Sequence, residues 1–187
     1  TLSTTEGYYY TASFNTERWS GDIKRNTIKV SDNGDVKVGD AASAVSAAAR
    51  LDALTDTQTS GRKIVVGLES AASSGGSAAL FTWSTIGDTL KAHLNKASPT
   101  ATADNDGQNR LNFLRGHRSQ EAVSFRQRNS RLGDIVHSAI AYSAAPTTRY
   151  NTPAYRTFYD NNKNRTKAVF VGANDGMLHA FNSTTMD

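Results

Sequence analysis

Cysteine is absent from this 187-residue chain, proline occurs only three times, and no apolar run approaches the roughly 20 residues that span a membrane. Without cysteine, a disulfide framework, a thiolate metal site and a cysteine nucleophile are all excluded. No basic-then-apolar stretch typical of a signal peptide opens the chain. Charged residues make up 20% of the sequence, too few for a coiled coil. These absences leave one globular domain, or part of a larger one.

Small and polar residues dominate what is present. Gly, Ser, Thr, Ala and Asn are plentiful and the apolar fraction is only 37%, a profile typical of a turn-rich β protein. The net charge of +4 permits contact with acidic surfaces without requiring it. Because the first residue is threonine rather than methionine, we expect the natural N-terminus to lie upstream, and the end at Asp187 is equally abrupt.

Alternating and apolar patterns predict strands in both halves of the chain. Residues 7–14 are predicted to form one strand. Residues 27–38 are predicted to form a hairpin, in which Asn33 and Gly34 supply the positive φ angles of a tight turn. Two further strands are predicted, a buried one at 61–67 and another at 134–142.

Two helical insertions are predicted between these β segments. Residues 41–54 are rich in alanine, lack glycine and proline, and follow Asp40 as an N-cap. Residues 84–96 repeat an apolar side chain at every fourth position on one face. The shorter predicted features are a helix at 111–114 that ends at Gly116 and loops at 71–79, 104–109 and 143–164.

The strongest signal is a strand–turn–strand unit at 167–181. Its two strands flank the turn Ala173-Asn-Asp-Gly176, and the small residues at the turn allow the close packing of an inner propeller hairpin. The segment Gly172-Ala-Asn-Asp-Gly-Met-Leu-His-Ala-Phe181 resembles the blade motif of PilY/PilC-type proteins, the adhesins of type IV pilus tips.

Further motifs resemble that family in the same order along the chain. They are Trp19-Ser-Gly-Asp-Ile23, Leu111-Asn-Phe-Leu-Arg-Gly116 with Glu121, Phe125-Arg-Gln-Arg128 and Arg131-Leu-Gly-Asp-Ile-Val-His-Ser138. One departure is Ala139-Ile140, where the family usually has a proline. The resemblance covers residues 7–187 and is densest over 111–187. Several motifs in the expected order make it specific.

The resemblance implies a mainly β fold. Residues 1–187 would be a fragment of one modified seven-bladed β-propeller domain, with short helical insertions at about 41–54 and 84–96 and a blade hairpin at 167–181. A propeller is held by ring closure, so the fragment is predicted to be stable only with the remainder of the protein or a partner that covers its open edges.

The resemblance also implies a function. The protein would be a non-enzymatic adhesin and assembly factor, exported to the pilus tip, cell surface or outer membrane of a Gram-negative bacterium. It would promote type IV pilus (fimbrium) extension, oppose retraction and support adhesion, twitching motility and virulence. The expected partners are minor pilins and the pilus tip complex, a host surface or glycan receptor, and the remainder of the same propeller, with no nucleic acid.

Calcium is the one cofactor that the family suggests. Some members bind calcium in an Asp-rich propeller loop, and by the resemblance that loop lies beyond Asp187. We therefore expect no cofactor and no metal in this segment, and calcium only in the full-length protein. The loop at Asp104–Gly107 opens like an EF-hand, but Gln108 and Arg115 stand where further oxygen ligands are required, so that pattern fails.

A basic stretch over residues 110–131 is a candidate interaction surface for an acidic glycan, a nucleic acid or an acidic pilin. Besides Arg110, its members are Arg115, Arg118, Arg126, Arg128 and Arg131. The interpretation that we favour is structural: Arg115 would pair with Glu121, and Arg128 with Asp134, to fix loops.

The polar residues of the blade motif are predicted to be structural. They are Gly172, Asn174, Asp175, Gly176 and His179. Asn-Asp-Gly is what hairpin turns select, and histidines such as His137 and His179 are interpreted as hydrogen-bonded parts of the scaffold. No nucleophile elbow, phosphate loop or helical histidine pair occurs, so no catalytic residue is predicted.

Two alternative functions stay open at this point. The blade motif also resembles that of pyrroloquinoline quinone dehydrogenases, which share the propeller architecture, and a quinone absorbance in the purified protein would favour that class. The other alternative is a polyanion-binding surface at 110–131, which would show strongly salt-dependent binding.

Overall fold

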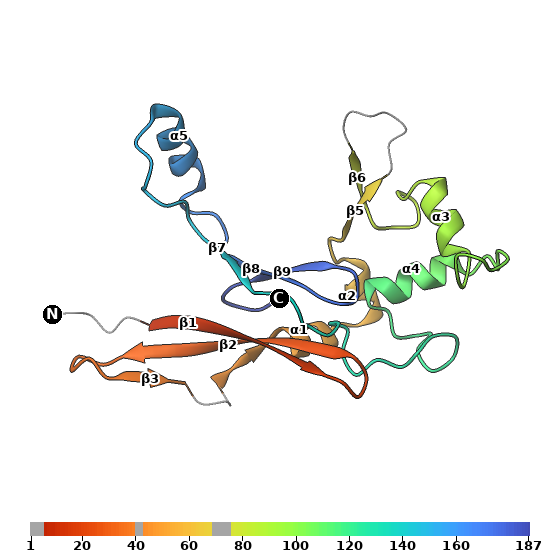
Figure 1. The fold of residues 1–187 in the computed structure, drawn as a ribbon, viewed down its shortest axis with the longest axis horizontal. Coiled ribbons are helices and arrows are strands. Elements are labelled where there is room, and N and C mark those ends of the chain that lie inside the picture. Colours follow the sequence, from red (N-terminus) through yellow and green to blue (C-terminus); the bar gives the residue numbers. More distant parts are fainter. Residues whose placement is uncertain (1–5, 40–42, 69–75) are drawn as a thin grey trace. The chain divides into compact units, whose positions relative to one another are not determined.

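The computed structural model describes residues 6–39, 43–68 and 76–187 (Figure 1). The chain divides into unit 1, Thr1–Ala53 with Arg128–Asp187, and unit 2, Leu54–Gln127. Within the described residues the architecture consists of small antiparallel sheets and short helices, which confirms the mainly β class. The closed ring of a propeller is not formed by these residues and stays a prediction. No helix in the described ranges is long and apolar enough to cross a membrane.

The first sheet of unit 1 contains a long antiparallel hairpin. Strands β1 (Glu6–Asn15) and β2 (Ser20–Val30) pair along their whole length, and β2 also pairs with β3 (Val36–Val38) and β4 (Val45–Ser46). The strand predicted at 7–14 and the hairpin predicted at 27–38 are confirmed. Ile23 of β2 is fully buried, so β2 supplies the part of this sheet that reaches the core.

The turn between β2 and β3 differs in type from the prediction. The N–H of Gly34 donates to the carbonyl of Ser31 at 2.8 Å, and the N–H of Ser31 donates to the carbonyl of Asp35 at 2.9 Å. Of the predicted pair only Gly34 has a positive φ, 86°. This is the longer hairpin loop, in which one left-handed glycine follows an ordinary turn.

The first predicted helix is much shorter than expected. Helix α1 covers Ala47–Asp52, and the hydroxyl of Ser46 caps it by accepting from the N–H of Ala49. The prediction began at residue 41, but residues 45–46 belong to β4, while residues 40–42, including the predicted N-cap, lie outside the described residues. The capping serine, rather than the alanine content, decides where the helix begins.

The second sheet of unit 1 contains the blade hairpin. Strands β8 (Ala168–Gly172) and β9 (Leu178–Asn182) pair antiparallel with Val171 opposite His179, and β7 (Ala141–Ser143) pairs with β8. The hairpin predicted at 167–181 is confirmed. Alternate side chains of β8 and β9 are buried, as the period of a strand requires.

Two predictions in this part of unit 1 are wrong. The strand predicted at 134–142 is reduced to β7, because residues 134–138 bind the blade hairpin through side-chain and backbone hydrogen bonds instead of extending a sheet. The loop predicted at 143–164 contains helix α5 (Pro153–Asn162), which begins with a proline and is capped by Thr152. The proline and asparagine content of this stretch favoured a loop, although Tyr155 and Phe158 lie on one face of α5 and contact each other, and no residue of α5 is buried.

Unit 2 packs short elements around a small apolar core. Its elements are α2 (Asp56–Ser60), β5 (Val65–Leu68), β6 (Ser77–Leu80), α3 (Asp88–Leu94) and α4 (Gly107–Arg115). Phe81, Ile86 and Leu111 form the centre of the core. The helix predicted at 84–96 is confirmed only as α3, since Ile86 packs into the core before the helix begins.

Helix α4 and its end follow the sequence closely. The helix predicted at 111–114 is present and begins earlier, at Gly107, inside the predicted loop 104–109. It ends at Gly116, whose φ of 114° is the left-handed conformation that glycine adopts without strain. The strand predicted at 61–67 is confirmed only from Val65, where β5 begins, and its expected burial is wrong, because Val65 is 65% exposed and β5 pairs with no described strand other than β6. Of the predicted loop 71–79, residues 77–79 lie in β6 and 71–75 lie outside the described residues.

Candidate functional site

Three of the sequence motifs meet in unit 1. The N–H of Gly21 donates to the carbonyl of Leu132 at 3.1 Å, and the N–H of Asn174 donates to the carbonyl of Asp134 at 2.9 Å. Segment 132–138 is therefore bonded on one side to the start of β2 and on the other to the blade hairpin. We call this assembly the motif junction and define it by Gly21, Gly133, Asp134, Asn174, Asp175 and His179.

Asp175 is the centre of the motif junction. Its Oδ2 accepts from the N–H of Gly133 at 3.1 Å and lies 2.8 Å from Nε2 of His179, while its Oδ1 accepts from the N–H of Met177 at 3.0 Å. The side chains of Asp175 and His179 are 20% and 5% exposed. One carboxylate thus ties the hairpin turn, strand β9 and segment 132–138 together.

The environment of Asp175 favours its ionised form. Burial by itself would raise the pKa of this carboxyl, but the hydrogen bond and the charge of His179, with the N–H groups of Gly133 and Met177, outweigh burial and lower the pKa below its ordinary value of 3.8. The ionised carboxylate is therefore part of the folded state.

This lowered pKa predicts an acid-sensitive contribution to stability. The folded pKa of Asp175 lies below the unfolded value, so its stabilisation is fully present above pH 3.8 and is lost as pH falls through the lower folded pKa. We expect the free energy of unfolding to decrease as the pH is lowered through this acid range. Asp175→Asn should make the free energy of unfolding depend less steeply on pH. Denaturant unfolding at a series of pH values measures it. An unchanged slope in Asp175→Asn would contradict this assignment.

Two glycines of the motif junction leave no room for a side chain. A Cβ on Gly21 would lie 2.3 Å from the carbonyl oxygen of Gly133, and a Cβ on Gly133 would lie 2.8 Å from Cβ of Asp175. Both distances are shorter than carbon contacts allow, and backbone atoms block each position. The sequence motifs therefore require glycine here for close approach of three chain segments.

The Gly-Asp-Ile triplet occurs in two of the three motifs and acts similarly in both. The carboxylate of Asp22 accepts from the hydroxyl of Ser46 at 2.8 Å and the N–H of Ala48 at 3.0 Å, which holds the start of α1. The carboxylate of Asp134 accepts from the side-chain amide of Asn174 at 2.6 Å. The isoleucine that follows each aspartate is buried. In each triplet, an aspartate that binds another segment of unit 1 is followed by an isoleucine that packs in the core.

The arginine pairs expected from the sequence are wrong in their partners. Within the described residues, Arg115 does not pair with Glu121, whose partner is Arg118 at 3.3 Å, and Asp134 does not pair with Arg128. Acidic partners had been expected because these arginines lie within the motifs that resemble the family. The structure instead surrounds the buried arginines with backbone carbonyl groups.

Arg115 and Arg131 are 3% and 7% exposed. In unit 2, Arg115 donates to the carbonyl of Phe81 at 2.7 Å and to the carbonyls of Ser60 and Arg62 at 2.6 and 3.0 Å. Burial lowers the pKa of Arg115. In unit 1, Arg131 donates to the carbonyls of Leu51 and Asp52. These two guanidinium groups hold chain segments together, and their N–H groups are already used by backbone carbonyls.

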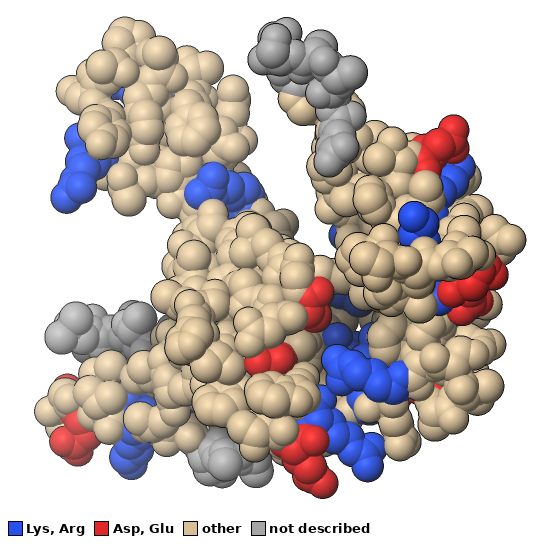
Figure 2. Space-filling model, turned by 45° about the vertical axis from the view of Figure 1, so that its right-hand side comes forward, with Lys and Arg blue, Asp and Glu red and all other residues tan. Residues whose placement is uncertain are grey.

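The other arginines of the candidate interaction surface are accessible. Arg126 is exposed, and Arg118 and Arg128 are half-buried. Acidic as well as basic side chains reach the face of the molecule drawn in Figure 2. Binding of an acidic partner by Arg118, Arg126 and Arg128 stays a prediction.

In the acidic loop at 104–107, the carboxylate of Asp104 is bound by an arginine side chain. Arg110 binds both carboxylate oxygens of Asp104, one of them at 2.7 Å, and this hydrogen bond lowers the pKa of Asp104 to about 2. Asp104 also accepts from the N–H of Asp106 at 3.0 Å. In the part of the chain that the structure describes, no group of three or more His, Asp or Glu side chains is arranged to hold a metal ion.

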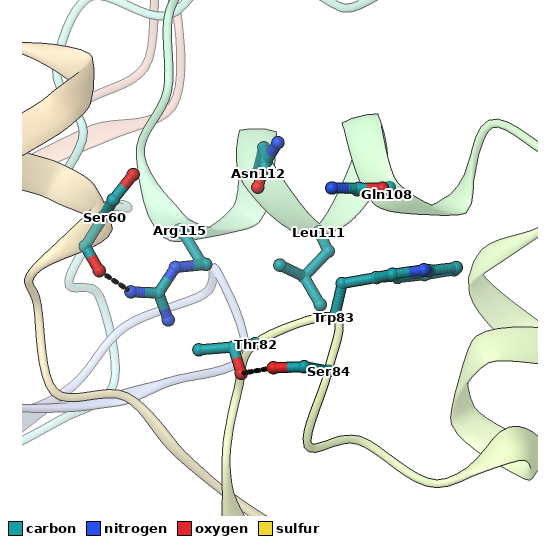
Figure 3. A pocket seen from close by; sticks show the side chains of 8 residues that line it. All are labelled: Ser60, Thr82, Trp83, Ser84, Gln108, Leu111, Asn112 and Arg115. Carbon is teal, nitrogen blue, oxygen red and sulfur yellow. Dashed lines mark hydrogen bonds between the residues drawn. The ribbon is translucent and has the colours of Figure 1, made fainter.

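A pocket of about 390 Å³ lies in unit 2, and no pattern in the sequence predicted it. Helix α4 forms one wall and the segment Thr82–Ser84 forms the other, with Ser60 at one end (Figure 3). Because its lining residues come from three separate parts of the chain, no local motif could have revealed it.

Comparisons with known proteins give one consistent result. The chain is 35% identical over 186 residues to "Type IV pilus biogenesis factor PilY1" of Pseudomonas aeruginosa strain PAK and 36% identical over 190 residues to that of strain UCBPP-PA14, which covers 94% and 95% of the chain. A "Type IV pilus biogenesis factor PilY1 homolog" of Xylella fastidiosa strain Temecula1 is 41% identical over 111 residues, covering 54% of the chain and 9% of that protein. The chain spans 15% of the length of the Pseudomonas relatives. No family model and no solved structure matches.

Proposed function

Because this chain is homologous over nearly its whole length to a segment of the PilY1-type type IV pilus biogenesis factors, we propose that it acts in type IV pilus biogenesis as part of a surface-exposed adhesin and assembly factor at the pilus tip. In this role the protein promotes pilus extension, opposes retraction and supports adhesion and twitching motility. It is exported, it binds minor pilins and the tip complex, and it meets a host surface or glycan receptor.

The observation that carries the proposal is the extent of the match to proteins of that name. An identity of 35% over 94% of the chain is too extensive to arise from the blade hairpin alone. Three of the motifs by which the sequence resembles the family also build the motif junction, so this part of the likeness concerns residues that hold unit 1 together. On this account the segment is a structural part of the pilus factor, with no catalytic residue and no cofactor of its own.

Surface piliation after deletion of the gene tests the proposal. We expect surface pili to disappear in cells with an active retraction motor and to return when the motor is disabled, because a factor that opposes retraction is dispensable without retraction. Pili counted by electron microscopy in the two backgrounds give the answer. If piliation is unchanged by the deletion, the proposed function is wrong, and absorbance of the purified protein for a bound quinone becomes the next measurement.

A further inference from the structure

The pocket in unit 2 has an aromatic side chain held in one place. A Cβ added to Gly107, the first residue of α4, would lie 2.8 Å from the Cη2 atom at the tip of the Trp83 indole. The indole therefore packs directly against Gly107. Nζ of Lys91 lies 5.9 Å from the centroid of the same ring. Figure 3 shows the ring beside Leu111, with Gln108 above it in that view.

The polar lining of the pocket consists of uncharged groups. It includes the hydroxyls of Ser60, Thr82 and Ser84 and the amides of Gln108 and Asn112. Within the part of the chain that the structure describes, the side chains of Gln108, Asn112 and Trp83 form no hydrogen bond with the protein. Each amide carries two donors and one acceptor, and the indole N–H adds a donor. These groups are available to a ligand.

The one charged residue that lines the pocket is directed elsewhere. The guanidinium group of Arg115 donates to three backbone carbonyls, so the protein already uses these N–H groups. Among the described residues that line the pocket there is no carboxylate. A strongly anionic or cationic ligand would therefore gain little here, and the small apolar area of Leu111 and the indole does not suit a wholly apolar ligand.

From this lining we propose that the pocket binds a neutral saccharide, one ring of which stacks on the indole of Trp83 while Gln108 and Asn112 bind its hydroxyls. The C–H groups on one face of a pyranose ring carry slight positive charge, which suits the negative face of an aromatic ring. Paired hydroxyls on a ring edge match side-chain amides, which donate and accept at adjacent atoms. The volume of about 390 Å³ lies in the range of small-ligand pockets and suits a mono- or disaccharide.

This inference goes beyond pilus biogenesis and does not depend on it. Binding to the purified protein would stand even if deletion of the gene left piliation unchanged, and loss of piliation would leave the pocket untested. The two claims therefore fail separately.

Ligand-observed saturation-transfer NMR on the purified full-length protein that contains this segment tests the proposal. The probes are the methyl pyranosides of glucose, galactose, mannose and N-acetylglucosamine, with methyl glucuronate as the anionic comparison. We expect saturable binding of at least one neutral probe with a dissociation constant on the order of 1 mM. Gln108→Ala and Asn112→Ala should each weaken that binding roughly fivefold or more, because each removes a hydrogen-bonding amide.

Asn109→Ala is the matched control for Asn112→Ala. Asn109 also lies on α4, but its amide donates to Asp106 at 2.7 Å and it does not line the pocket, so its removal should leave binding unchanged. Trp83→Ala should abolish binding, and the amide variants keep the test valid if that variant does not fold. The proposal is overturned if no neutral probe binds saturably, if glucuronate binds and the neutral sugars do not, or if Asn109→Ala weakens binding as much as Asn112→Ala.

Discussion

Asp175→Ala is expected to lower the free energy of unfolding of unit 1 by about 3–5 kcal/mol, because it leaves several buried or partly buried hydrogen-bonding groups without their acceptor. Three hydrogen-bonding groups lose their acceptor together: the N–H groups of Gly133 and Met177 and the imidazole of His179. None of these groups gains another protein partner from the substitution. Urea unfolding, followed by tyrosine fluorescence or circular dichroism, measures the loss.

Asp160→Ala is the matched control for this prediction. Asp160 is also in unit 1 and also has a basic partner, Lys163 at 3.0 Å, but its side chain is 63% exposed. Because exposed ion pairs contribute little, this variant should unfold almost as the unchanged protein does. If the two variants unfold alike, Asp175 is not the centre of a stabilising network.

Arg115→Met is expected to lower the free energy of unfolding of unit 2 by about 3–5 kcal/mol, because three buried or partly buried carbonyls lose their donor. The carbonyls belong to Ser60, Arg62 and Phe81, so one guanidinium group joins the end of α2, the following turn and the segment after β6. Amide hydrogen exchange reports the change by segment, for example at the N–H of Phe81, which donates to Ile64 at 2.7 Å.

Lys63→Met is the control for Arg115→Met, since it removes the same charge from the same unit at an exposed position. It should leave exchange at Phe81 unchanged. Arg115→Lys adds a second comparison, because one ammonium group cannot reproduce the fork that binds carbonyls on two sides. Full protection in Arg115→Lys would mean that charge alone, rather than the geometry of the guanidinium, holds unit 2.

Local patterns predicted the hairpins of this fold well. Turn residues such as Gly34 and the Asn174-Asp-Gly176 sequence act within a few positions of themselves, and the strands they join follow directly in the chain. The end of α4 at Gly116 was predicted for the same reason. In each case the physical cause lies inside the sequence window that reveals it.

The motif junction could be predicted only as a set of motifs, not as an arrangement. Gly133 and Asp175 are distant in sequence, and nothing in either segment specifies that the N–H of one meets the carboxylate of the other. The requirement for glycine at 21 and 133 depends on that meeting, since the atoms that exclude a Cβ come from the other segments. The glycines are visible in the sequence, but the sequence does not show which other segments leave no room for a side chain at these positions.

The partners of the arginines were missed because their position in the family-like motifs suggested acidic partners, and the burial of Arg115 could not be seen in the sequence. Arg115 is the last residue of α4 and is buried in unit 2. Its acceptors there are the carbonyl groups of Ser60, at the end of α2, and Phe81, which follows β6. Helix α5 was missed because the proline and asparagine content of 143–164 indicated a loop, although Pro153 stands at the start of the helix, where proline is favoured. Tertiary packing decided the partners of Arg115, whereas local capping by Thr152 decided where α5 begins.

The measurement that tests the central claim most directly is the number of surface pili on gene-deletion cells complemented with Asp175→Ala or Asp160→Ala, with the retraction motor active. The claim is that this segment serves pilus biogenesis through the fold that the motif junction holds together. We expect Asp160→Ala to restore normal piliation and Asp175→Ala to leave the cells without pili until retraction is disabled. Normal piliation with Asp175→Ala in cells that retract would contradict the claim.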